Sequence, residues 1–244
     1  LLDDTVRPNF WRAPTNNDEG CAEPFAFAFW KTAGLYARCD NLTAEAKDEF
    51  VTVRANYTLP NGQTLPIDFA IDGAGRCDIT MTWQGARTEL PEFGLLFPLR
   101  RELTEVSYLG LGPRETAADR TAGGKMGEWS YNIRQDFAQN SPVYPQECGS
   151  RTDVYRAAVT GNIPGICFAG DGMTFSALPY TPHELENARH LYELPRDDNK
   201  TVVRCAAFQR GVGGDNSWGA KPHADACFAV EKGMTFAFTI QKQG

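Results

Sequence analysis

The chain has 244 residues, of which 42% are hydrophobic, so it can bury a substantial core and is not a disordered chain. Its 31 acidic residues outnumber 24 basic ones, giving a net charge of −7, and no run of Lys or Arg is present. No apolar stretch approaches the ~20 residues that a membrane-spanning helix needs. We therefore expect a globular protein with neither nucleic-acid nor membrane partners.

The seven cysteines are scattered, and no two have the C-x-x-C spacing of a structural zinc site. Four of them lie in strand-like apolar runs, where cysteine behaves as a small buried hydrophobe: Cys77, Cys167, Cys205 and Cys227. The odd number indicates reduced thiols and favours the cytoplasm, with the periplasm as the alternative. The N-terminal residues 1–4 lack Met and signal-peptide features, and we interpret them as a cut inside a longer protein.

The alternation of apolar and polar residues predicts most of the secondary structure in the first half of the chain. Residues 25–33, which end at Gly34, are expected to form a short helical turn. Three alternating runs then follow at 51–59, 65–71 and 77–83. The segments that join them contain the turn-forming residues Asn61-Gly62 and Asp72-Gly73, so these runs predict an antiparallel meander.

The second half of the chain has the same pattern of apolar runs separated by turn-forming residues. Strands are expected at 154–160, 165–169, 173–178, 201–209, 226–230 and 234–241, with a turn at Gly170-Asp171-Gly172. Thr181, Pro182 and Glu184 have the spacing of a capped helix that runs to about Arg189. This pattern predicts an all-β protein, with residues 1–244 forming a single domain of two large packed antiparallel sheets.

Four segments are dense in polar, Gly, Pro and aromatic residues, and loops of this kind often carry function. Residues 7–20 place amides and acids between two aromatic-proline clusters. Such side chains suit the hydroxyls of a sugar, but Asx turns alone also explain such a loop.

The segment 108–115 contains two glycines but lacks the third one of a dinucleotide fingerprint, and Pro113 removes a backbone donor, so a packed turn is expected. In the segment 144–151, Glu147 and Arg151 are expected to form an exposed pair that fixes the loop.

The fourth segment, 211–219, places Trp218 among glycines. An indole stacks well on the C–H face of a pyranose and its N–H reaches a hydroxyl. The alternative is that Trp218 folds back as a lid over the sandwich, since Trp is buried on average.

No pair of acids among Asp18, Glu19, Glu23 and Asp215 has a spacing that marks a glycosidase pair. His183, His190 and His223 are expected to be structural, because no tuned partner is evident for any of them. The sequence therefore predicts neither a catalytic residue nor a metal site in this chain.

Together these segments resemble the C-terminal domain of the large, lactose-cleaving β-galactosidases of glycoside hydrolase family 2. The matching residues are Phe10–Asp18, Gly110–Glu115 with Asp119 and Arg120, Pro145–Glu147 with Gly149 and Arg151, and Gly213–Trp218. They occur in the family's order, and the resemblance covers residues 7–241. One departure is Ala117, where the family often carries Tyr and where we expect a different packing contact.

The resemblance implies an antiparallel super-sandwich like that of galactose mutarotases, and hydrolysis of terminal β-D-galactosides with retention. It implies that the catalytic glutamates lie in an upstream (β/α)8 barrel, the partner of this domain, and that the full enzyme is a homo-oligomer. No cofactor is expected in this domain, because the family's Mg and Na sites lie mainly upstream. The isolated chain is expected to be inactive.

The resemblance also assigns substrate-binding residues. Trp218 is similar to the tryptophan that forms a platform for the second sugar, the aglycone. Residues 20–23, which follow Asn17 and Asp18, resemble a mobile active-site loop with Glu23 as its acidic member. The predicted substrate-binding set is Trp218, Asn17, Asp18, Gly20 and Glu23.

Two other functions remain open on the residues alone. A freestanding carbohydrate-binding module would use the same aromatic platform. A mutarotase-like epimerase would need a base and an acid, for which His183 or His190 with Glu184 are the available residues.

Overall fold

A computed structural model describes residues 1–216 and 218–243. The strands are β1 (Arg7–Asn9), β2 (Arg38–Lys47), β3 (Phe50–Thr58), β4 (Thr64–Asp72), β5 (Cys77–Thr82), β6 (Thr88–Glu89), β7 (Glu92–Arg100), β8 (Leu103–Gly112), β9 (Lys125–Asn132), β10 (Ser150–Gly161), β11 (Gly165–Leu178), β12 (Lys200–Gln209), β13 (Ala229–Val230) and β14 (Thr235–Gln243). The helices are α1 (Asn16–Gly20), α2 (Glu23–Ala26), α3 (Ala28–Ala33), α4 (Ile133–Asn140) and α5 (Pro182–Asn187), with 3-10 turns η1 (Leu191–Glu193) and η2 (Ala224–Ala226).

The predicted meander is confirmed. Strands β3, β4 and β5 pair in sequence order, so that Val51 lies opposite Ile71 and Ile71 opposite Cys77. Gly62 and Gly75 have φ angles of 82° and 80°, values that glycine adopts without steric cost and that close the two turns.

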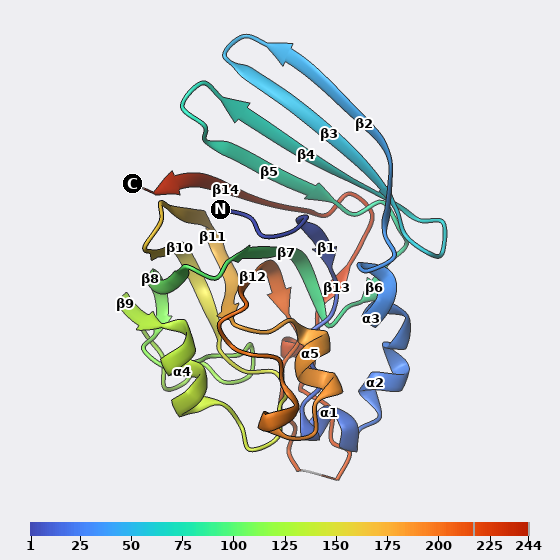
Figure 1. Cartoon of the computed structure of the whole chain (residues 1–244). Coiled ribbons are helices and arrows are strands. Elements are labelled where there is room, and N and C mark those ends of the chain that lie inside the picture. The colour runs from blue at the N-terminus through green and yellow to red at the C-terminus, as the bar shows by residue number, and fades with distance from the viewer. Residues whose placement is uncertain (217, 244) are drawn as a thin grey trace.

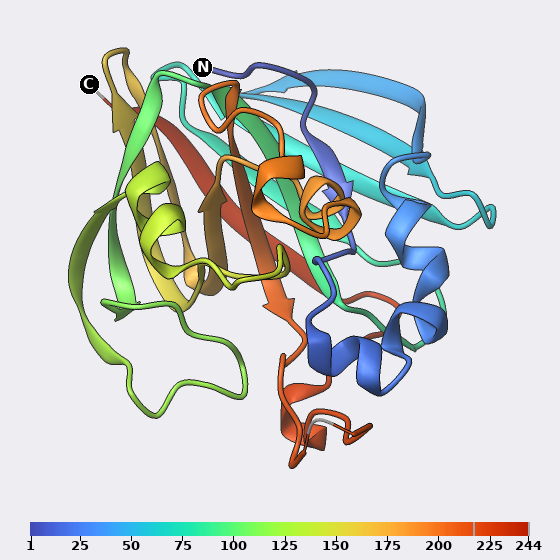
Figure 2. The same cartoon turned by 60° about the horizontal axis from the view of Figure 1, so that its bottom comes forward.

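Twelve strands form one antiparallel sheet, which forks at β11 (Figures 1 and 2). The first half of β11 pairs with β14, which leads on to β5, β4, β3 and β2. The second half pairs with β12, which leads to β7 and β1. Strand β10 accompanies β11 on its other side and continues the sheet to β8 and β9.

The fork explains one wrong prediction. Residues 165–178 form one strand and not two strands separated by a turn at Gly170-Asp171-Gly172. Val154 pairs with Met173 but Arg156 pairs with Ala169, so one residue of β10 faces three of β11 in a bulge. Gly172, at φ 65°, lies where β11 changes its partner from β14 to β12.

The two branches of the fork face each other across the core. Phe97 of β7 packs edge-on against Phe168 of β11 and Phe238 of β14, with ring centroids 5.1 and 6.0 Å apart. Trp83, after β5, meets Phe93 of β7 at 5.9 Å. The predicted antiparallel all-β sandwich is confirmed, with its layers continuous through β11.

The predicted helices are also present. Thr181 and Glu184 form a capping box at the start of α5, which ends at Asn187, two residues before the expected Arg189. The expected turn at 25–33 is divided between α2 and α3, and Gly34 follows α3. No helix within residues 1–216 and 218–243 is long and apolar enough to cross a membrane.

All seven cysteines are unpaired. Cys77 and Cys205 are buried as expected, whereas Cys167 and Cys227 are partly exposed.

Candidate functional site

The candidate site is built around the segment 211–219, which leaves the end of β12 and lies beside α1 (Figure 2). Asp119, which is distant in sequence, contacts the first three residues of this segment. Asp119 accepts hydrogen bonds from the backbone N–H of Val212 at 3.1 Å and of Gly213 at 2.7 Å. A Cβ on Gly211 would lie 2.5 Å from Asp119 Oδ2, so this close approach requires glycine.

A buried ion pair supports the same segment from the N-terminal side. Arg12 donates from Nη1 and Nη2 to both oxygens of Asp18, at 2.5 and 2.9 Å, and from Nη2 to Gly211 O at 2.8 Å. Burial alone would raise the pKa of Asp18, but the Arg12 charge brings it below its usual range. Asp18 also accepts from Thr15, which caps α1, so the pair joins α1 to the loop.

Glu23 makes a second buried pair. Its Oε1 accepts from Arg210 Nε at 2.8 Å, and Arg210 directly precedes the loop. Burial raises the pKa of Glu23 above its ordinary value, against the opposing effect of Arg210. Asp18 and Glu23 therefore both point at arginines inside the protein; direct contact of either carboxylate with sugar stays a prediction.

Asn17 and Gly20, at the two ends of the same stretch, lie next to the loop. Asn17 Nδ2 donates to Val212 O at 3.4 Å. A Cβ on Gly219 would lie 3.4 Å from Gly20 O, so the end of α1 reaches the far end of the loop. Ala22, between α1 and α2, has a φ of 59°, a left-handed conformation that costs ~1–2 kcal/mol for a residue with a Cβ.

Trp218 projects from this anchored loop with 90% of its surface exposed. Its backbone N–H donates to Asn216 Oδ1 at 2.8 Å. The alternative interpretation, in which Trp218 folds back as a lid over the sandwich, is therefore wrong for this conformation of the chain. The indole face is left free for another molecule.

A polar cavity of about 440 Å³ adjoins the loop, and its lining is Asp119, Arg120, Gly213, Gly214, Asp215, His223 and Asp225. His223 Nε2 lies 2.8 Å from Asp215 Oδ1. The hydrogen bond to Asp215 and its charge raise the pKa of His223 above its ordinary value. His223 thus has a carboxylate partner, whereas no tuned partner was expected for it from the sequence.

The expected exposed pair between Glu147 and Arg151 is wrong, because both residues are buried and have other partners. Arg204 lies between Glu147 and Glu92, donating to an oxygen of each. Gln209 Nε2 donates to the same two oxygens, at 3.0 Å for Glu92 and 3.1 Å for Glu147. Burial raises the pKa of Glu92.

Arg151 instead extends beneath the turn that follows β8. It donates to Tyr108 Oη at 3.2 Å and to Asp136 of α4 at 3.2 Å, and it stacks over the Tyr131 ring at 4.9 Å. The segment 108–115 is thus the end of β8 followed by a packed turn, as expected for its second part only.

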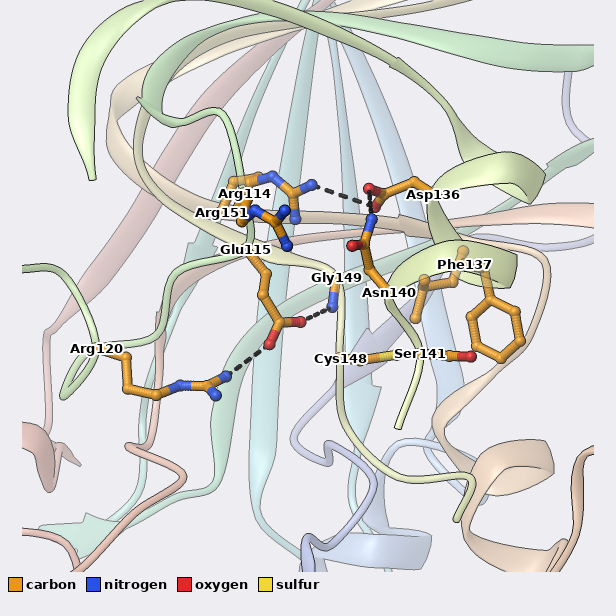
Figure 3. A pocket seen from close by; sticks show the side chains of 11 residues that line it. Arg114, Glu115, Arg120, Asp136, Phe137, Asn140, Ser141, Cys148, Gly149 and Arg151 are labelled. Atoms are coloured by element: carbon orange, nitrogen blue, oxygen red, sulfur yellow. Dashed lines mark hydrogen bonds and ion pairs between the residues drawn. The ribbon is translucent and has the colours of Figure 1, made fainter. Parts of the chain in front are cut away.

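Arg151 and Asp136 line a second cavity of about 270 Å³ (Figure 3). Figure 3 shows Glu115 between Gly149 N and Arg120, to which its oxygens are bonded at 2.7 and 2.8 Å. The fold therefore brings the second and third polar segments of the sequence together, with Glu115 of the second bonded to the Gly149 N–H of the third.

His183 and His190 do not form an acid–base pair with Glu184. Glu184 caps its own helix and pairs with Lys200 at 2.6 Å, while His183 Nε2 lies 2.7 Å from Lys31 O. His190 stacks on Tyr192. Within residues 1–216 and 218–243, no group of His, Cys, Asp and Glu has the arrangement of a metal site.

Comparison with known proteins gives consistent matches. A family model described as beta galactosidase small chain matches residues 1–240. The β-galactosidase of Lactobacillus delbrueckii subsp. bulgaricus is 37% identical over 238 residues, which are 95% of this chain and 23% of that protein. The β-galactosidase of Priestia megaterium is 34% identical, over 99% of this chain and 24% of that protein.

A third relative is shorter. The β-galactosidase small subunit of Latilactobacillus sakei is 32% identical, over 88% of this chain and 77% of that protein. The chain thus spans about a quarter of the first two relatives and most of the third. Among solved structures, a galactose mutarotase related enzyme from Lactobacillus acidophilus aligns with 84% of this chain and 71% of its own, at 8% identity and a TM-score of 0.39.

Proposed function

We propose that this chain, which belongs to the beta galactosidase small chain family, forms the aglycone side of the active site of a β-galactosidase. In this proposal the chain carries no catalytic residue. We expect an enzyme of glycoside hydrolase family 2 that hydrolyses terminal β-D-galactosides such as lactose with retention. Its nucleophile and acid/base lie outside this chain, in the larger partner that carries the (β/α)8 barrel.

The exposure of Trp218 on an anchored loop is the observation that carries this proposal. Stacking of a solvent-exposed indole on the C–H face of a pyranose is favourable, and the indole N–H can donate to a sugar hydroxyl. Asp119 and the end of α1 hold the backbone on either side, so part of the ordering cost is met before sugar binds. The ring is well suited to a leaving-group sugar that extends out of a partner's active site.

Asp18 and Glu23 enter this proposal as positioning residues. Each holds an arginine, Arg12 or Arg210, against the start of the Trp218 loop. Asn17 and Gly20 border the loop itself and are the nearer candidates for contact with substrate.

A catalytic role for Glu92 and Glu147 is disfavoured by their surroundings. Retaining glycosidases hold two carboxyl groups about 5 Å apart on either side of the scissile bond. Glu92 and Glu147 are close enough to share Gln209, but both are buried and both bind Arg204, which leaves no room for a sugar between them.

The test is Trp218→Ala in the intact enzyme, assayed with lactose. Loss of the stacking surface should raise KM about tenfold with kcat little changed, because the ring binds the aglycone and moves no proton. Trp218→Phe, which keeps an aromatic face, is the control and should retain most of the affinity. A thousandfold fall in kcat with unchanged KM would show that the platform assignment is wrong.

The same exposed indole also favours a second candidate, a freestanding carbohydrate-binding module. Such a module binds sugar without a partner, so calorimetric titration of the chain with galactose and lactose separates the two. We expect almost no binding; a Kd well below millimolar would favour the module.

A further inference from the structure

The branch of the sheet formed by β2, β3, β4, β5 and β14 has one apolar face. Its residues stand in three cross-strand rows, each running from the edge strand β2 to β14. The rows are Leu42, Ala55, Ile67, Met81 and Phe236; Ala44, Val53, Phe69, Ile79 and Phe238; and Ala46, Val51, Ile71, Cys77 and Ile240.

This face is covered at one end and bare at the other. Along the first row the exposed fraction falls from 65% at Leu42 to 3% at Ala55 and 0% at Met81. In the third row it is 44% at Val51 and 38% at Ile71. The covered end is the one that packs on β7, whereas β2 to β5 spread beyond β14 in Figure 1. We name the bare end the apolar corner; it consists of Leu42, Ala44, Ala46, Val51 and Ile71.

The opposite face of the same strands is polar. Thr43 and Thr52 lie on it, and Arg54 of β3 pairs with Asp68 of β4 at 2.6 Å. Alternation of this kind is typical of a sheet with one face in water and one face against protein. The apolar corner therefore has the composition of a contact surface.

The edge of β2 is built against strand addition. It carries a bulge between Cys39 and Asn41, and four charged residues: Arg38, Asp40, Glu45 and Lys47. Bulges and edge charges oppose pairing with another strand. An occupant of the corner is therefore expected to lie over the face, not to extend the sheet.

We propose that the apolar corner is the surface on which the larger, catalytic part of the enzyme packs, as a second contact remote from the Trp218 loop. This inference rests on the proposed function, in which the chain is the smaller of two parts. Stable contact between folded parts needs about 800 Å² per partner with an apolar centre, and the corner supplies such a centre. A second copy of the chain is disfavoured, because each copy carries a net charge of −7.

Thiol labelling in the intact enzyme tests the proposal. Leu42→Cys and Thr43→Cys introduce thiols at neighbouring positions of β2, the first on the apolar face of the sheet and the second on the polar face. Mass spectrometry distinguishes the labelling of each introduced thiol from that of the native cysteines. A covered corner should make Cys at 42 react at least about tenfold more slowly than Cys at 43, because labelling depends on access. Ala44→Cys, a smaller change on the apolar face, repeats the test if Leu42→Cys misfolds.

A photo-reactive residue at position 42 then identifies the occupant. Cross-links to the larger part support the proposal. Cross-links to β2–β4 of a second copy, or equal labelling at positions 42 and 43, overturn it. Neither readout uses Trp218 or activity: if the corner is covered but Trp218→Ala leaves lactose KM unchanged, the proposed function fails and the docking surface stands.

Discussion

Arg204 is the residue on which the buried polar centre depends. It binds both Glu92 and Glu147, and all three side chains are buried. Arg204→Met would leave two buried carboxylates without their cation, so it should lower the free energy of unfolding by about 3–5 kcal/mol. Urea unfolding of the purified chain measures the effect.

Arg54→Met is the matched control, because Arg54 pairs with Asp68 on the solvent-facing side of the sheet with its side chain 55% exposed. Its cost should be only ~0–1 kcal/mol. Equal effects of the two substitutions would contradict the assigned difference between the buried and the exposed pair.

His223 provides a pH-dependent prediction. Because Asp215 raises the pKa of His223, the charged contact is complete below the ordinary histidine pKa and is lost as pH rises through the higher folded value. NMR titration of the His223 ring should give a pKa above about 6.5, and Asp215→Asn should bring it back toward that value. An unchanged pKa in Asp215→Asn would contradict the pairing.

The site could be predicted from the sequence only in part, and the reason lies in residue separation. The segments that hold Asn17, Gly20 and Trp218 are recognisable because each is continuous and compositionally unusual. The arginine that binds Glu23 is 187 positions away, and Asp119 is 93 positions from Val212. No local pattern in the sequence predicts partners at such separations, so the ion pairs of Asp18 with Arg12 and of Glu23 with Arg210 could not be predicted.

At the scale of elements, Gly172 sets the geometry of the fork. It lies in the three-residue bulge at which β11 leaves β14 and joins β12, and its φ of 65° is unfavourable for any residue with a Cβ. Gly172→Ala should destabilise the chain by about 1–2 kcal/mol. Gly73→Ala is the control, since a Cβ there meets nothing within 4 Å and its φ is not in the left-handed region. Thermal unfolding compares them; equal loss at both positions would contradict this role.

Three neighbouring strands were predictable because one face of each is buried and the other lies in water. Strands β3, β4 and β5 have this alternation, and their bounds agree with the expectation to within a residue. Strand β7 was missed because eight of its nine residues are buried, so no alternation remains. Strand β2 was missed for the opposite reason, since every residue in it is exposed.

The molecule has two surfaces at which aromatic or apolar side chains are left exposed to solvent. The Trp218 loop and α1 lie at one end, and β2 to β5 spread at the other (Figure 1). One end exposes an indole on an anchored loop, and the other exposes an apolar sheet corner. This arrangement suits a part that binds a larger partner and contributes one wall of its active site.

The most direct test of this account is the turnover of nitrophenyl galactoside by the purified 244-residue chain. Circular dichroism should show a folded β protein, and we predict no hydrolysis above the buffer rate, because the proposed nucleophile and acid/base lie outside this chain. Hydrolysis that persists through purification and is abolished by substituting an acidic residue of this chain would contradict the account.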